Sequence, residues 1–400
     1  LRGEYDFIAP GENSNGRAGA PGDQVGGGGV GVMFNYYAVL SPNHGAGTGA
    51  VSVADSGLGL AGTVGVGNSL VGGGGGDQVG SGGITVLNND NALVLSPNWN
   101  GAAGAVTFLD LANGNLIGDS DFAAAVAAGN SLIGAAANDS IGGDGVAEYS
   151  TGGSDYYAVF CTAFDNGAAG DAVAVRFADA NTGLAGIVSN ANSFVGVNAN
   201  DLIGQGGAGD VVSLSNGNVV LVNTQYDADS GAVTFVDLVN GVGLAGDIDS
   251  TSSLTGAAAG DEIGSGGVST VFNADVYSVE SPLWNGTNGA VSFGSITSGL
   301  TGVVGAANAL VGSSAGDAPG SNGISALSTT SGTRIVVLSP LWDNGAATDA
   351  GAITTFLDSA PATGAIDATN SLVGTNTDDD VGAGSQVGLS NGNRLFLTPT

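Results

Sequence analysis

An aromatic or histidine side chain recurs at one place in the chain, shortly after a β-rich run. Its six members are His44, Trp99, Phe164, Tyr226, Trp284 and Trp342. Four of them closely follow a Ser-Pro pair, at Ser41-Pro42, Ser96-Pro97, Ser281-Pro282 and Ser339-Pro340. Exposed rings in such a series can stack on sugar rings, whereas buried rings pack as wedges between layers. The six are the candidate ligand-binding residues, and both interpretations stay open.

Carboxylates follow this position in several copies and can offer the oxygen ligands that Ca²⁺ prefers. The candidate metal ligands are Asp165, Asp227, Asp229, Asp343 and Asp349. A solvated acidic surface is the alternative interpretation. No cofactor is therefore certain, and Ca²⁺ is the metal ion considered.

The sequence gives little support for zinc binding, nucleophilic catalysis or phosphate binding. His44 is the only histidine, which excludes a zinc site built on several histidines, and Ser41 lies in no nucleophile motif. Cys161 is the single cysteine and has apolar neighbours, which indicates a small buried side chain. The run Gly72–Gly76 lacks the Gly-Lys-Ser/Thr ending of a phosphate loop. We therefore expect no enzyme and no catalytic residue.

The segments that must position these residues are repeated. The stretch Asn68–Leu87, NSLVGGGGGDQVGSGGITVL, has close copies along the chain, and its aspartate marks them. The aspartate falls at Asp23, Asp77, Asp139, Asp201, Asp261, Asp317 and Asp379, with successive spacings of 54, 62, 62, 60, 56 and 62 residues. One sustained period of this length predicts a repeat architecture.

Each repeat reads as four short strands. In the second copy these are Ile84–Leu87, Ala92–Ser96, Gly104–Phe108 and a weaker fourth run that ends near Asn130. The fourth strand often begins with Gly-Leu-Ala/Thr-Gly, as at Gly59–Gly62, Gly183–Gly186, Gly243–Gly246 and Gly299–Gly302. The predicted fold is all-β: one domain, residues 1–400, forming a seven-bladed β-propeller of four-stranded antiparallel blades. A β-solenoid is the competing architecture.

The two ends bear on ring closure. The last copy has two strands, Gln386–Leu389 and Arg394–Leu397, and the alternating segment Glu4–Ile8 can supply a missing third strand. Pairing of the N-terminal strand with the C-terminal blade would close the ring and remove exposed edges. The same strand can instead complete the next molecule and give a filament.

The repeats resemble FG-GAP repeats, the propeller blades of integrin α chains and of many bacterial surface proteins. The resemblance rests on Leu70-Val71-Gly72, Gly76-Asp77, Leu93–Pro97 and Gly104–Phe108, and covers nearly the whole chain. The resemblance implies a propeller fold. It also implies possible Ca²⁺ sites, because many such blades bind Ca²⁺ through a loop that opens with Asp. Here the third loop position is Val25, Val79, Ile141, Ile203, Ile263, Pro319 or Val381, which offers no oxygen. We therefore expect the repeated Asp to cap its turn by accepting backbone N–H bonds, with Val or Ile in the core.

The net charge of the chain limits which binding partners are expected. With 5 basic and 36 acidic residues the net charge is −31, which disfavours nucleic acid, and no apolar run is long enough for membrane insertion. We expect an extracellular or cell-surface protein, secreted, that acts in adhesion or as a structural subunit of a surface layer or filament. Its expected partners are further copies of itself, other surface proteins or glycans. The alternative is a carbohydrate-binding (lectin-like) or carbohydrate-cleaving propeller.

Overall fold

The computed structural model describes residues 17–18, 22–153, 155–170, 172–329, 332–384, 386–388 and 394–396. The chain forms two compact units. The first contains residues 1–208 and 244–246, and the second contains residues 209–243 and 247–400. Among the described residues, each unit holds three consecutive sheets of four to six strands, and two further sheets have two strands each.

The first unit contains the short turns α1 (His44–Gly47) and α2 (Trp99–Ala102) and strands β1 (Arg17–Ala18), β2 (Gly29–Met33), β3 (Tyr36–Ser41), β4 (Ala50–Asp55), β5 (Gly62–Thr63), β6 (Leu70–Val71), β7 (Gly83–Val86), β8 (Ala92–Ser96), β9 (Ala105–Asp110), β10 (Asn115–Leu116), β11 (Ser131–Ile133), β12 (Val146–Ser150), β13 (Asp155–Cys161), β14 (Ala174–Asp179), β15 (Gly186–Ile187) and β16 (Phe194–Val195).

The remaining elements are η1 (Gly207–Asp210), β17 (Val211–Ser213), β18 (Val219–Asn223), α3 (Tyr226–Asp229), β19 (Ala232–Val236), β20 (Gly246–Asp247), β21 (Ser253–Thr255), β22 (Gly267–Thr270), β23 (Val276–Ser281), α4 (Trp284–Thr287), β24 (Ala290–Ser295), β25 (Gly302–Val303), β26 (Ala309–Val311), β27 (Ile324–Thr329), β28 (Gly332–Ser339), β29 (Ala352–Leu357), β30 (Gly364–Ala365), β31 (Ser371–Val373), β32 (Gln386–Gly388) and β33 (Arg394–Phe396).

The second repeat shows the sheet pattern. Strands β7, β8, β9 and β11 follow one another in antiparallel order, with Ile84 opposite Val94, Leu95 opposite Val106, and Val106 opposite Leu132. The predicted second strand, Ala92–Ser96, is confirmed residue for residue, and the first and third are confirmed within one or two residues. An all-β repeat protein is therefore what the sequence folds into.

The predicted fourth strand is wrong in its position. The Gly-Leu-Ala/Thr-Gly segment leads into a two-residue strand that pairs in parallel with the sheet of the preceding repeat, as β15 does with β11. The fourth strand of the repeat's own sheet is the later Asn-Ser-Leu-Val-Gly segment, such as β16 on β14. Both segments are short and glycine-flanked, so strand propensity alone did not separate their roles.

This parallel pairing of a short strand with the preceding sheet joins one repeat to the next. In the first unit β5 pairs with β1, β15 pairs with β11, and Gly246 of β20 donates to the Ser193 carbonyl at 3.0 Å. In the second unit β25 pairs with β21, and β30 pairs with β26. The last strand of each linked sheet thus receives a fifth neighbour from the following repeat.

The predicted ring is not seen. The described residues form no closed barrel or propeller, and six sheets of this size are present rather than seven blades. Blades of the expected propeller would meet through side chains alone, whereas here backbone pairing also connects successive repeats. The proposed closing strand, Glu4–Ile8, lies outside the described residues.

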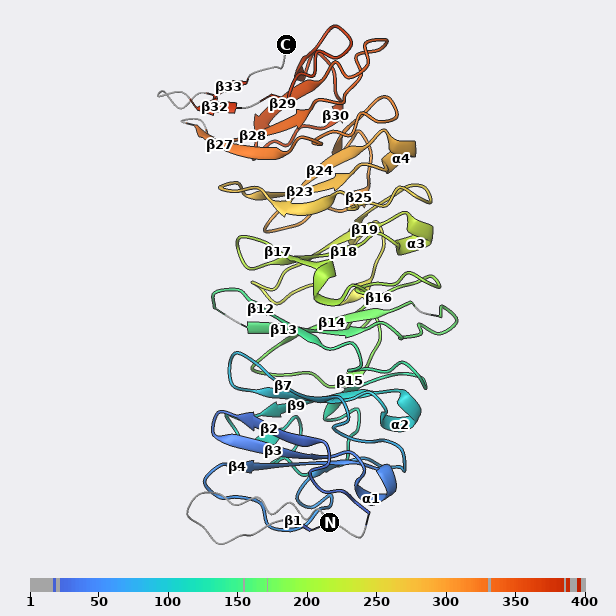
Figure 1. Cartoon of the computed structure of the whole chain (residues 1–400), viewed down its shortest axis with the longest axis vertical. Helices are drawn as coiled ribbons and strands as arrows, with labels where there is room; N and C mark the ends of the chain where they lie inside the picture. Colours follow the sequence, from blue (N-terminus) through green and yellow to red (C-terminus); the bar gives the residue numbers. More distant parts are fainter. Residues whose placement is uncertain are drawn as a thin grey trace. The chain divides into compact units, whose positions relative to one another are not determined.

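Four hydrophobic cores each lie between two consecutive sheets of a unit, which lie one on the next in Figure 1, and a smaller cluster lies on the last described full sheet alone. Along β8, Val94 belongs to the core shared with the first sheet, while Leu93 and Leu95 belong to the core shared with the third. The second unit repeats this arrangement between its own sheets. Because successive side chains of a strand point to opposite faces, a sheet of this kind is covered on both sides.

We expect Leu93→Ala to lower the free energy of unfolding by about 2–5 kcal/mol, because it opens a cavity between two sheets. Leu93 is fully buried, whereas Leu58 is 87% exposed. Leu58→Ala is the matched control and should change stability by less than about 0.5 kcal/mol. Urea unfolding followed by circular dichroism measures both, and equal effects would contradict the packing described here.

Candidate functional site

The repeated aspartate forms the most regular polar site of the molecule. The Oδ2 atom of Asp77 accepts the N–H groups of Gly73 and Gly74, both at 2.8 Å, and Oδ1 accepts the N–H of Asn100 at 3.0 Å. In the same way, Oδ2 accepts two consecutive backbone N–H groups at Asp139, Asp201, Asp261, Asp317 and Asp379. One carboxylate thereby ties its own loop to the loop that follows the second strand of the same sheet.

Two glycines let the loops close around this carboxylate. A Cβ on Gly104, which has a φ of +79°, would lie 2.1 Å from the Ile141 nitrogen. A Cβ on Gly134 would lie 2.2 Å from the Ala103 carbonyl oxygen and 2.8 Å from the Asp139 Cβ. Only a residue without a side chain fits such approaches. These two glycines therefore serve the aspartate loop.

The apolar residue two positions after the aspartate packs into the core. Val79, Ile141, Ile203 and Ile263 are fully buried, and Val381 is 8% exposed. The aspartate itself is buried from Asp23 to Asp317. This is the arrangement predicted from the sequence, with the carboxylate as a turn cap and the branched side chain in the core.

Burial and hydrogen bonding act on this carboxylate in opposite directions. At Asp139 burial raises the pKa above its ordinary value of 3.8, against the lowering effect of the N–H groups of Ala136, Asp165 and Ala135. At the more exposed Asp379 the N–H groups of Asn376 and Thr375 lower the pKa. Hydrogen bonds from backbone N–H groups thus stabilise the charged form of the carboxylate.

The six aromatic or histidine positions lie beside these loops, at different depths. Phe164, Tyr226 and Trp342 are buried, at 2%, 7% and 4% exposure. Trp99 and Trp284 are half-buried and pack against the cores of their sheets. The wedge interpretation describes the three buried rings, whereas Trp99 and Trp284 keep part of their surface in solvent.

The residue after the ring begins a tight left-handed turn in four repeats. Asn100 and Gly101 have φ values of 51° and 69°, and Asn285 and Gly286 have 50° and 67°. Asp227 and Asp229 lie in the same turn, with φ values of 46° and 63°. This turn presents its first N–H to the aspartate, as Asn285 does to Asp261 at 2.9 Å.

The other proposed calcium ligands lie in the longer loops of two repeats. The N–H of Asp165 points at Asp139, that of Asp343 points at Asp317, and the Asp343 carboxylate accepts the N–H of Asp349 at 2.9 Å. Over the described part of the chain, no three His, Cys, Asp or Glu side chains are grouped as metal ligands. Calcium binding at these aspartates remains a prediction.

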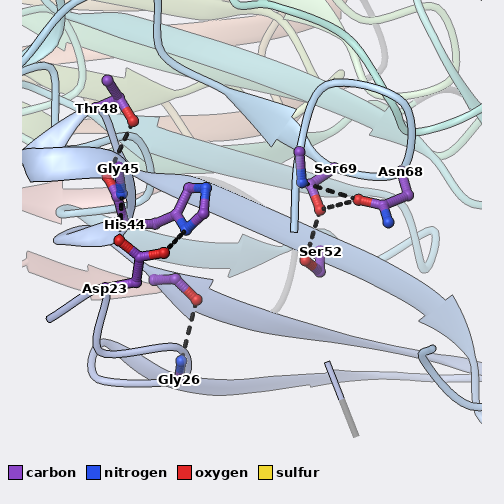
Figure 2. A network of polar contacts seen from close by, with 10 residues as sticks. Asp23, Gly26, His44, Gly45, Thr48, Ser52, Asn68 and Ser69 are labelled. Atoms are coloured by element: carbon purple, nitrogen blue, oxygen red, sulfur yellow. Dashed lines mark hydrogen bonds and ion pairs between the residues drawn. The ribbon is translucent and has the colours of Figure 1, made fainter. Parts of the chain in front are cut away.

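His44 pairs with the first repeated aspartate. Its Nδ1 lies 3.1 Å from Asp23 Oδ2, and Asp23 Oδ1 accepts the Gly45 N–H at 3.0 Å (Figure 2). The nearby Ser41 hydroxyl accepts the Gly26 N–H, just as Ser96, Ser281 and Ser339 accept those of Gly80, Gly264 and Gly320. The serine of each Ser-Pro pair therefore fixes a loop, and Cys161, fully buried, holds that place in the third repeat.

A second polar motif was missed from the sequence. Buried hydroxyl groups join the third and fourth strands, as Ser52 and Ser69 do at 2.7 Å (Figure 2) and as Thr107 and Ser131 do. The asparagine before that serine closes the preceding loop, because Asn68 accepts the Gly65 N–H and donates to the Thr63 carbonyl. The repeated Asn-Ser was the signal that could have revealed it.

The third repeat departs from this motif. Arg176 stands where the others have Ser or Thr, and its guanidinium donates to the Asn192 carbonyl. Tyr157, fully buried, lies close enough to Arg176 to interact with it electrostatically. Burial lowers the pKa of Arg176 and raises that of Tyr149 to about 12. These groups serve the interior of one sheet rather than a surface site.

A pocket in the second unit has two aspartates in its lining. It has a volume of about 390 Å³, and its lining includes Asp275, Asp358, Phe293 and Pro361. The two aspartates come from the fifth and sixth repeats, and no spacing in the sequence singled them out. The lining of this pocket thus combines acidic and apolar side chains.

Comparison with known families identifies the repeat. Six segments match a family described as a repeat of unknown function (DUF5650), at residues 35–81, 86–143, 153–205, 213–265, 272–321 and 331–383. No curated protein matches the chain. The match does not identify FG-GAP repeats. Among the described residues, no helix is both long and apolar enough to span a membrane.

We expect Asp139→Asn to lower the free energy of unfolding by about 1–3 kcal/mol, because an amide nitrogen then faces backbone N–H donors. Asp90 is exposed, so Asp90→Asn is the control and should leave stability unchanged. Thermal and urea unfolding compare the variants. Equal stability of the two would show that the carboxylate does not hold the loops together.

The carboxyl of Asp249 supports a pH prediction. Its pKa lies below 3.8, chiefly because the Thr251 hydroxyl donates to it at 2.6 Å and the Thr251 N–H at 2.7 Å. A lowered pKa contributes stability that is present above the unfolded-state pKa and lost as pH falls through the folded one. Thr251→Val should raise this pKa, and its stability deficit should shrink in acid.

Carboxyl NMR titration and melting curves between neutral and strongly acidic pH test this. Thr301→Val, at an exposed threonine, is the control. An unchanged Asp249 pKa in Thr251→Val would contradict the assignment.

Proposed function

The chain belongs to the family of DUF5650 repeats, and we propose that it is a non-enzymatic structural or adhesive protein of the cell surface. In this proposal the repeats act together as a scaffold, with self-association or binding to other surface proteins or glycans as the outcome. The observation that carries it is the use of the repeated aspartates. Their carboxylates are occupied by backbone N–H groups and are not free for chemistry.

The other reactive side chains support the same proposal. Cys161 is fully buried, and burial raises the pKa of its thiol, which disfavours the nucleophilic thiolate. The serines of the Ser-Pro pairs accept backbone N–H bonds inside loops. The net charge of −31 suits a soluble, mutually repelling exterior and disfavours nucleic acid.

The proposal also includes the predicted propeller and its alternative, a filament. A seven-bladed FG-GAP-like propeller would require the first and last repeats to pair, and the segment that would do so lies outside the described residues. A filament of repeats requires pairing between molecules instead. Both versions place the repeats in an extracellular assembly and differ in which copy supplies the strand.

Surface location can be tested on cells of the source organism. Antibodies against the purified chain should label intact cells, and brief protease treatment of intact cells should remove the label. An abundant intracellular protein is the control and should stay unlabelled until the cells are opened. Labelling only after permeabilisation would contradict the proposal.

Carbohydrate binding is the second candidate, because two observations favour it. Trp99 and Trp284 keep part of their rings in solvent, and Asp275 and Asp358 line one pocket. A glycan array should then show binding that falls about tenfold or more in Trp99→Ala, in Trp284→Ala or in the Asp275→Asn/Asp358→Asn double variant, consistent with the loss of stacking or hydrogen bonding.

Leu58→Ala removes an exposed apolar side chain elsewhere and should keep the full signal. Release of reducing sugar that stops in the double aspartate variant would indicate cleavage rather than binding. No signal from the wild-type chain on the array would remove the lectin alternative.

A further inference from the structure

The pocket of about 390 Å³ lies where the fifth sheet meets the sixth, and both sheets belong to the second unit. The fifth repeat contributes Asp275, Val276 and Phe293 to its lining, and the sixth repeat contributes Asp358 and Pro361. A volume of this size falls within the range of small-molecule sites. The corresponding contacts between other sheets show why space is left here.

In two other pairs of consecutive sheets an asparagine closes the same gap. The side-chain amide of Asn91 donates to the Ala180 carbonyl at 2.9 Å, and that of Asn218 donates to the Ile296 carbonyl at 3.0 Å. Both asparagines are buried. Each thereby ties the start of the second strand of one repeat to the end of the third strand of the next.

The fifth and sixth repeats lack this amide. Val276 stands where the two asparagines stand, five residues before the last residue of the second strand. Asp358 stands where the two acceptor residues stand, six residues after the first residue of the third strand. Valine has no side-chain donor. Among the described residues the Asp358 carboxylate accepts the Ser359 N–H at 2.7 Å, and no side-chain amide donates to the Asp358 carbonyl.

A proline keeps the same gap open. Three residues after the acceptor position, Gly183 has a φ of +67°, and a Cβ on it would lie 2.3 Å from the Phe108 ring. Gly299 packs in the same way on the equivalent phenylalanine. In the sixth repeat this position is Pro361, whose ring fixes φ at about −65° and excludes that turn. The turn therefore cannot close onto Phe293, which lines the pocket instead.

The lining thus supplies hydrogen-bond acceptors where the other repeats place a donor. The carboxylates of Asp275 and Asp358 only accept hydrogen bonds when they are ionised. Phe293 is held edge-on against Phe356, with 4.9 Å between ring centroids, and forms an apolar wall. Two carboxylates are too few for the six to eight oxygen ligands of Ca²⁺. Carboxylates beside an apolar wall instead favour a positive charge with N–H donors on a short apolar chain.

We propose that this pocket binds a primary alkylammonium group, with its N–H bonds to Asp275 and Asp358 and its alkyl chain against Phe293. The chain contains no lysine, so a second copy cannot supply a lysine side chain. The group therefore belongs to a free alkylamine or to a lysine of a partner protein. The inference goes beyond the structural function proposed above and does not depend on it.

An NMR titration of the full chain tests the proposal, with pentylamine as the free amine and a blocked Gly-Lys-Gly peptide as the lysine probe. The wild type should bind pentylamine saturably, whereas pentanol, which has the same carbon chain without the charge, should not bind. Asp275→Asn and Asp358→Asn should each weaken binding by about tenfold or more, because a charge-assisted hydrogen bond is lost. Binding of pentylamine alone assigns the site to free amines, and binding of both probes assigns it to lysine side chains as well.

Asp90→Asn is the matched control, because Asp90 is an exposed aspartate outside the pocket, and it should bind pentylamine like the wild type. Circular dichroism checks that all variants keep their fold. No saturable binding of either amine, equal binding of pentanol, or an equal loss in Asp90→Asn would overturn the proposal. An equal loss would mean that amines are attracted to the acidic surface in general. Surface labelling of cells is a separate readout, so the structural function can stand if the pocket binds no amine.

Discussion

The interaction on which each repeat depends is a buried carboxylate that accepts backbone N–H groups from two loops. An ionised group away from water is costly unless it is paired or fully hydrogen-bonded. Asp77 meets that condition with the N–H groups of Gly73, Gly74 and Asn100. Asp139 shows the cost of burial. Burial raises the pKa of its carboxyl, although backbone N–H groups donate hydrogen bonds to it. The loops must therefore hold their shape for the aspartate to be tolerated at all, and the aspartate in turn fixes the loops.

That constraint explains why glycine stands at the closest approaches between the loops. Gly104 and Gly134 stand where a Cβ would meet backbone atoms of the facing loop, so the loops can reach the carboxylate only through glycine. The same loops place Val or Ile in the core and the aromatic residue beside it. Of the aromatic series that the sequence singled out, Phe164, Tyr226 and Trp342 are buried in this packing. Trp99 and Trp284 are the members of the aromatic series whose packing leaves them partly in solvent.

Much of this could be predicted from the sequence, because it is periodic. The aspartate spacing predicted the repeat, and the apolar run that stops before Pro97 predicted the second strand as Ala92–Ser96. The missing oxygen ligand at Val79 or Ile141 indicated a turn cap rather than a calcium loop. The role of the Asn-Ser-Leu-Val-Gly segment could not be predicted in the same way. A two-residue strand carries almost no propensity signal, and its neighbours are set by contacts with the next repeat. Arg17-Ala18 shows the difficulty, since only backbone pairing reveals it as a copy of Leu132-Ile133.

Because a short strand of each following repeat pairs with the sheet of the repeat before it, a single repeat is not a complete structural unit. A sheet of four strands from one repeat is incomplete, because its fourth strand has an edge that only the following repeat covers. Stability then depends on nearest neighbours, as in other repeat proteins.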